Sequence, residues 1–133
     1  MSVTSLMQGD LVRLVAIDPE TDADTWARWT QDSEYSRLLD SDPALPRSAI
    51  HFRSEIQKTE QRSDDYGFAV RTLAGNRLIG FVDLGDIQWS HRNCSLGIGI
   101  GEREFWGMGY GSDTLRLVLR YAFTELNLVR VSL

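Results

Sequence analysis

The sequence predicts an α/β (α+β) domain in which helices flank a mixed, largely antiparallel sheet. Residues 66–73 and 77–89 are strand-like runs on either side of a short polar turn, which predicts an antiparallel hairpin. A glycine-rich strand is expected at 94–101. Apolar side chains then recur with a helical period over 112–126, and a fifth strand is expected at 128–133. This strand, loop, helix, strand series is typical of a crossover between parallel strands.

The first half of the chain is expected to contain one strand and two helices. Residues 11–17 are rich in aliphatic and β-branched side chains and end at Pro19, which predicts a strand. The acidic stretch after Pro19 suits a helix N-terminus. Two prolines predict a loop over 38–46, and apolar spacing predicts a second helix over 47–61.

Length and composition fit a single domain over residues 1–133. The chain is 42% hydrophobic and 25% charged, as in ordinary globular proteins. No apolar stretch approaches the ~20 residues needed to span a bilayer, and the first ten residues lack the features of a secretory signal. A single cysteine, Cys94, cannot form an internal disulfide, so a cytoplasmic location is expected.

Nucleic acids, membranes and metal ions are not expected partners. The formal net charge is −5, and the 14 basic residues form no stripe with interleaved aromatic side chains. The two histidines, His51 and His91, lie far apart, and no Cys/His pair has ligand spacing. His91 lies in a polar turn and is expected to be exposed.

Residues 107–112 form a glycine-rich turn directly ahead of the last helix. Unpaired amides at a helix start, together with the helix dipole, favour an anion, and glycines let a diphosphate approach the backbone. A tight strand-to-helix turn is the structural alternative. The P-loop pattern is excluded because no lysine lies near the turn, and the Rossmann pattern is excluded because its third glycine is missing.

The segment WGMGYG, residues 106–111, resembles the Q/R-x-x-G-x-G/A signature of the GNAT N-acetyltransferases. The similarity is strongest to the branch that includes the N-terminal acetyltransferases of ribosomal proteins. It extends from about Leu11 to Leu133 and is concentrated in residues 94–133. Trp106 stands where the general signature has Gln or Arg, which is usual for this branch.

The resemblance implies a GNAT-like sheet with splayed fourth and fifth strands and acetyl-CoA as co-substrate. A bulge in the fourth strand is expected at Gly97 or Gly99. Arg103 is expected either to pair with a CoA phosphate or to be an ordinary solvated side chain. The resemblance assigns the pantetheine arm to the backbone of Leu96, Ile98 and Ile100, and the pyrophosphate to Gly107, Met108, Gly109, Tyr110, Gly111 and Ser112.

The resemblance also implies direct acetyl transfer to a primary amine in a ternary complex. The backbone N–H of Ile98 is the expected donor to the thioester carbonyl. Asp83 and Asp86 are three apart on one strand, so they should face opposite sides of the sheet. Of the two, Asp83 is the preferred candidate for the base, and a solvated surface role for it is the favoured alternative. Cys94 has no evident base and is expected to be a small buried residue.

Family members continue beyond the fifth strand with further strands, an Asn and a Tyr that protonates the CoA thiolate. This sequence ends at Leu133, so a truncated domain is expected. An apolar, unpaired edge on the fifth strand leaves three alternatives: the sequence is a fragment, a partner such as a second copy in a homo-oligomer covers the edge, or activity is compromised. Two alternatives to the enzyme stay open: a non-catalytic acyl-CoA-binding module, and a half-domain that needs a partner chain. The resemblance implies that the acceptor is a protein N-terminus or a small amine.

Overall fold

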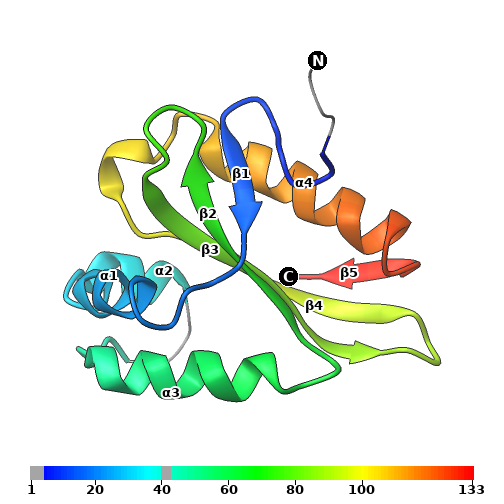
Figure 1. Ribbon diagram of the computed structural model, residues 1–133, viewed down its shortest axis with the longest axis horizontal. Coiled ribbons are helices and arrows are strands. Elements are labelled where there is room, and N and C mark those ends of the chain that lie inside the picture. The colour runs from blue at the N-terminus through cyan, green and yellow to red at the C-terminus, as the bar shows by residue number, and fades with distance from the viewer. Residues whose placement is uncertain (1–4, 40–42) are drawn as a thin grey trace.

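The computed structural model describes residues 5–39 and 43–133, which form a five-stranded sheet flanked by helices (Figure 1). The strand order is β1-β2-β3-β4-β5, antiparallel throughout except for the parallel pair β4–β5. The strands are β1 (Val12–Val15), β2 (Tyr66–Thr72), β3 (Leu78–Gln88), β4 (Asn93–Ile100) and β5 (Arg130–Ser132). The helices are α1 (Asp22–Trp29), α2 (Ser33–Leu39), α3 (Ala49–Glu60), the short 3-10 helix η1 (Arg103–Phe105) and α4 (Tyr110–Thr124). The predicted mixed, largely antiparallel sheet is confirmed.

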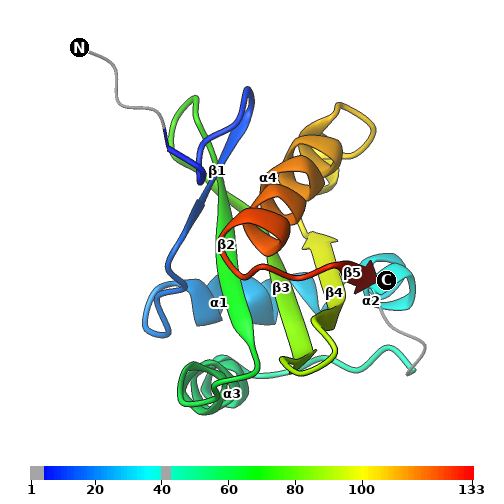
Figure 2. The same cartoon turned by 90° about the vertical axis from the view of Figure 1, so that its right-hand side faces the viewer.

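The helices cover the two faces of the sheet unequally. In Figure 2, α4 crosses in front of the strands and α1 lies behind them. The larger core lies between the sheet and α4, where Val82 and Leu84 pack with Leu117 and Val118. A smaller cluster on the other face contains Trp29, Tyr35, Ala69 and Leu78. The sheet is therefore buried on both faces near its centre.

The single helix expected after Pro19 is in fact two helices. The Asp32 carboxylate accepts the backbone N–H groups of Glu34 and Tyr35, at 3.1 and 3.2 Å, and so starts α2 in a new direction. The loop expected over 38–46 is also wrong at its start, because α2 continues to Leu39. Residues 40–42 of that expected loop lie outside the described residues.

The expected bulge at Gly97 or Gly99 is wrong. The pairing of β4 with β3 keeps one register from Ser95 to Ile100. The register shift lies instead on β3, between Gly85 and Gln88, where Asp86 adopts a φ of +50°. Two smaller expectations are confirmed, since Cys94 is buried and His91 is exposed.

The glycines of β4 allow side chains from the α1/α2 side to pack directly against its backbone. A Cβ on Gly97 would lie 2.7 Å from Asp83 Oδ1, and one on Gly99 would lie 2.8 Å from the Tyr35 hydroxyl. A Cβ on Gly101, just beyond the strand, would overlap the Trp29 indole ring. The bare strand face predicted from the sequence exists, and these side chains occupy it.

We expect Gly101→Ala to destabilise the fold by about 2–3 kcal/mol, because the new methyl group displaces the buried Trp29 ring. Thermal unfolding should show a melting temperature lower by roughly 10 °C. Gly111→Ala is the matched control, since a Cβ there meets nothing within 4 Å. Equal melting temperatures for the two variants would contradict this packing.

Candidate active site

The turn at 107–112 leaves the first amides of α4 without helical partners. Gly107 and Gly109 have φ values of +71° and +89°, which only glycine adopts at little cost. The helix begins at Tyr110, two residues earlier than expected, and its N-cap Gly109 offers no side chain. The first backbone hydrogen bond of the helix is donated by the Asp113 N–H to the Gly109 carbonyl, at 3.0 Å. This geometry suits an anion.

Asp113 lies in the first turn of α4 but does not cap it. Its carboxylate accepts the amides of Leu11 and Val12, at 2.9 and 3.0 Å, and also binds Arg116 at 2.5 Å. Burial raises the pKa of Asp113, but these hydrogen bonds outweigh burial and hold the pKa below its ordinary value. Asp113 therefore ties the β1 segment to α4 and leaves the turn's amides free.

The outer edge of β4 presents backbone groups beside this turn. The Gly101 amide donates to the Ile79 carbonyl at 2.8 Å, which sets the alternation of the ladder. By that alternation, three residues direct their N–H groups away from β3: Leu96, Ile98 and Ile100. Among the described residues, β5 pairs with 93–95, and the parallel Ser95–Ser132 pair engages the Leu96 N–H, so the unpaired part of this edge comprises Ile98 and Ile100. The Trp106 indole N–H donates to the Ile100 carbonyl at 2.6 Å and links the edge to the turn.

Arg103 is bound by acidic residues at the start of α2. Its guanidinium contacts Asp32 at 2.5 Å and Glu34 at 2.8 Å, and it stacks over Trp106 at 5.1 Å. The hydrogen bond from Arg103 lowers the pKa of Asp32 to about 2. The side chain is half exposed, so Arg103 holds η1 against α2 while staying in reach of solvent.

Asp83 and Asp65 meet on the α3 side of the sheet. Asp83 lies opposite Gly67 on β2 and Gly97 on β4. A Cβ on Gly85 would lie 3.2 Å from Asp65 Oδ2 and 3.5 Å from Asp83 Oδ2, so the two carboxyl groups reach the same place. Burial, reinforced by the neighbouring Asp65 charge, raises the pKa of Asp83 to about 7. The expected alternation does not hold at Asp86, because the register shift between Gly85 and Gln88 interrupts it. Asp86 has 83% of its side chain exposed and approaches Arg62 at 4.0 Å.

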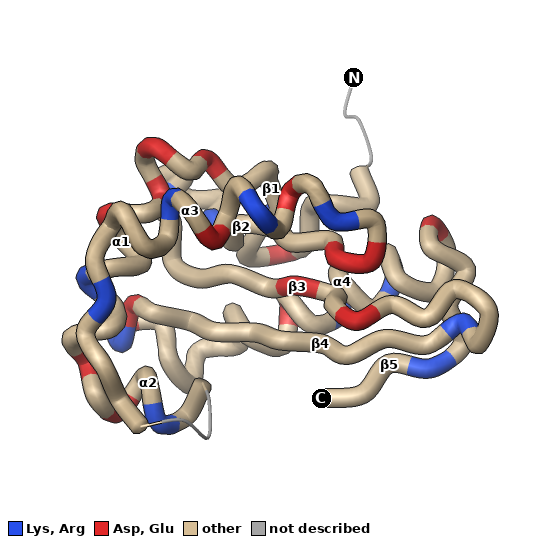
Figure 3. Tube along the Cα trace, turned by 90° about the horizontal axis from the view of Figure 1, so that it is seen from below, with Lys and Arg blue, Asp and Glu red and all other residues tan. Residues whose placement is uncertain are grey.

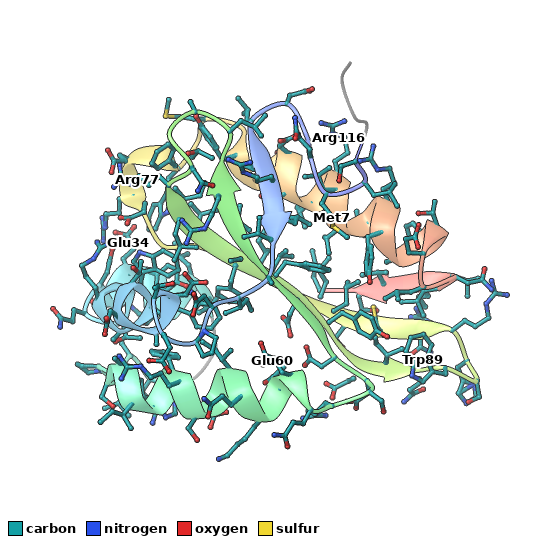
Figure 4. The ribbon with its side chains drawn as sticks, viewed as in Figure 1. Met7, Glu34, Glu60, Arg77, Trp89 and Arg116 are labelled. Carbon is teal, nitrogen blue, oxygen red and sulfur yellow. The ribbon has the colours of Figure 1, made fainter. Side chains whose placement is uncertain are left out.

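A cavity of about 250 Å³ opens beside this carboxyl pair, between α1, α3 and the sheet. Figure 3 shows acidic positions on α3, on the turn that follows it and on β3. In Figure 4, Glu60 lies on the side of α3 that faces the sheet. The acidic lining residues are Glu55, Glu60, Asp65 and Asp83, and the larger apolar ones are Ile17, Trp26, Ile56, Phe81 and Val82.

Sequence reasoning missed three of the four acidic residues of this cavity. Lining residues 55, 56, 59 and 60 share one face of α3, a spacing that is visible in the sequence. Glutamates on such a face resemble an ordinary solvated surface. Asp65 immediately precedes β2, and only the fold brings it to Asp83.

The structure offers no cluster of three or more His, Cys, Asp or Glu side chains that would hold a metal ion, within residues 5–39 and 43–133. In the same part of the chain, no helix has the length and apolar character needed to cross a membrane.

Residues 12–133 match the family model of the acetyltransferase (GNAT) domain, and the chain belongs to this family. The resemblance found in the sequence is thereby confirmed. A curated relative, the uncharacterized N-acetyltransferase p20 of Bacillus licheniformis, is 24% identical over 114 residues. The alignment covers 83% of this chain and 62% of that relative, so the chain spans less than two thirds of the relative's length.

Solved structures with the same fold include two enzymes from Vibrio cholerae. A putative ribosomal-protein-serine acetyltransferase has a TM-score of 0.76 at 23% identity, covering 94% of this chain and 70% of that one. A spermidine N-acetyltransferase in complex with CoA and spermine has a TM-score of 0.77 at 24% identity, covering 90% and 68%. At these identities the likeness establishes the fold, including the arrangement of sheet and helices.

Proposed function

We propose that the chain is an acetyl-CoA-dependent N-acetyltransferase that moves an acetyl group directly to a primary amine within a ternary complex. The observation that carries the proposal is the continuity of free backbone groups from the outer edge of β4 to the start of α4. Membership of the GNAT family supports it. Acetyl-CoA supplies the activated thioester, and the chain's own residues bind and orient it and take the first proton of the amine. As the C–N bond forms, the C–S bond breaks, and the leaving CoA thiolate takes the second proton of the attacking nitrogen to become the thiol.

The turn fits a diphosphate. Gly107 and Gly111 leave open space where a Cβ would stand, and Met108 and Ser112 are exposed. The amides of residues 107–112 and the Ser112 hydroxyl then supply the donors. The Arg103 charge is already shared with Asp32 and Glu34, so we assign it a supporting role in holding the loop beside the diphosphate.

The edge of β4 fits an extended chain with amide groups, such as a pantetheine arm. Ile98 directs both its N–H and its C=O outward and unpaired. Leu96 keeps only its C=O, because β5 uses its N–H, and Ile100 keeps only its N–H, because Trp106 uses its carbonyl. The Ile98 N–H is the proposed donor to the thioester carbonyl, where negative charge develops during transfer.

Asp83 is the proposed base. The acceptor must lose its proton before it attacks, and a carboxylate with a pKa of about 7 accepts a proton near neutral pH. Asp83 lines the cavity and lies over Gly97, next in sequence to Ile98. The acceptor is therefore proposed to bind in the cavity and to reach the thioester across β4.

Calorimetry with acetyl-CoA, followed by a thiol-release assay on a panel of amines, tests this function. The panel contains a peptide with a free N-terminus, an amino acid, a polyamine and an amino sugar. We expect binding of acetyl-CoA and amine-dependent thiol release. Binding without turnover on any amine supports the acyl-CoA-binding module instead, and absence of binding contradicts both. The homo-oligomer at the β5 edge stays a prediction, which sedimentation of the free chain tests.

A further inference from the structure

We infer that two carboxylates at the start of α2 restrain the affinity of this site for CoA. Asp32 and Glu34 hold the Arg103 guanidinium against α2, and so withhold its positive charge from the diphosphate. The inference rests on the proposed function, because it concerns the same diphosphate turn. Removal of a surface charge at this point should therefore make CoA bind more tightly.

Arg103 lies close to the turn at the start of α4. It begins η1, and the Phe105 ring at the end of η1 packs on the ring of Tyr110, the first residue of α4, at 4.8 Å. The guanidinium stacks on the Trp106 indole, which is fixed to the edge of β4 by its hydrogen bond to the Ile100 carbonyl. A cation is thereby placed near both the edge of β4 and the diphosphate turn.

The guanidinium is held by carboxylates in the geometry that a phosphate would use. Nε and Nη2 of Arg103 donate to the two carboxylate oxygens of Asp32, at 2.5 and 2.6 Å, and Nη2 also contacts Glu34 at 2.8 Å. Guanidinium groups bind carboxylates and phosphates through the same fork of N–H groups, so the two acids and a phosphate compete for it. Because CoA is also the product that must leave, a restrained affinity favours turnover.

Glu34 is the informative member of the acidic pair. Asp32 also accepts the backbone N–H groups that start α2, so replacing it would alter the helix as well as the charge. The Glu34 side chain is half exposed, and Arg103 is its one ion-pair partner within residues 5–39 and 43–133. In Figure 4, Glu34 lies on the side of α2 that faces η1. Glu34→Gln therefore removes one of the two carboxylates that hold the guanidinium and keeps the helix start.

Calorimetry with CoA measures the restraint directly. Glu34→Gln should bind CoA about fivefold more tightly than the unaltered chain, because a phosphate then competes better for Nη2 of Arg103. The gain should shrink as salt is added, since these side chains are exposed to solvent. Dephospho-CoA should show the same gain, because it keeps the diphosphate. Glu20→Gln is the matched control: Glu20 is exposed, pairs with Arg53 at 3.8 Å ahead of α1, and should leave the affinity unchanged.

Arg103→Gln tests whether Glu34 acts through the guanidinium. In that background Glu34→Gln should change the CoA affinity by less than about twofold, because there is no cation left to release. An unchanged or weaker affinity in Glu34→Gln overturns the inference, as does a gain that persists in full without Arg103 or disappears with dephospho-CoA. A chain that binds CoA but gains nothing from Glu34→Gln contradicts this inference alone. If neither the unaltered chain nor Glu34→Gln binds CoA, the proposed function fails together with it.

Discussion

Gly109→Glu should abolish acetyl-CoA binding, with an affinity at least ~100-fold weaker by calorimetry. Gly109 is the N-cap of α4 and has a φ of +89°, a conformation that a glutamate adopts only with strain. The new carboxylate would stand at the positive end of the helix, where the diphosphate is proposed to bind. Charge repulsion and the loss of space at the amides therefore both weaken acetyl-CoA binding.

Gly75→Glu is the matched control for this variant. Gly75 has a φ of +84° in the hairpin turn between β2 and β3, and a Cβ there meets nothing within 4 Å. The same substitution thus introduces similar backbone strain, about 1–3 kcal/mol, far along the sequence from α4. It should lower stability and leave binding intact. Wild-type affinity in Gly109→Glu would show that the diphosphate does not occupy this turn.

The elements that the sequence predicted correctly are those with strong local periodicity. The β2–β3 hairpin and α4 show their patterns over seven or more residues, and Asn127, with a φ of +56°, follows α4 as the expected stop. The break between α1 and α2 was not predictable in this way. Asp32 both caps α2 and binds Arg103, which is 71 residues away, so a tertiary contact stabilises the break.

Within the candidate site, the glycine-rich turn was predictable from the sequence and the acidic cavity was not. The turn at 107–112 is contiguous, so its glycines and the following helix appear together in the sequence. The cavity combines α1, α3 and β3, and its carboxylates are distributed over residues 55–83. The β4 glycines illustrate the same limit, because their spacing predicts a bare face without indicating that Trp29 and Tyr35 cover it.

Asp83→Asn should lower the rate of acetyl transfer by about 10²–10⁴-fold, because an amide cannot accept the proton of the amine. In the unaltered enzyme the rate should rise with pH through about 7, as Asp83 becomes ionised. The pH–rate profile of the variant should lack this rise through pH 7. Asp86→Asn is the control: it lies three residues away, is exposed, and keeps a residue type that tolerates its φ of +50°.

The same variant should make the fold more stable, which separates a catalytic defect from unfolding. Burial raises the pKa of Asp83 from 3.8 to about 7, so the folded state disfavours the ionised carboxylate. The stability that the protonated group contributes is full below pH 3.8 and is lost as the pH rises through about 7. At pH 8, the free energy of unfolding of Asp83→Asn, measured in urea, should therefore be on the order of 2 kcal/mol higher than that of the unaltered chain. This difference should vanish in acid. If Asp83→Asn is both inactive and less stable at pH 8, Asp83 has a structural role. If the rate falls while the stability rises, Asp83 is a carboxylate that serves the reaction and lowers the stability of the fold.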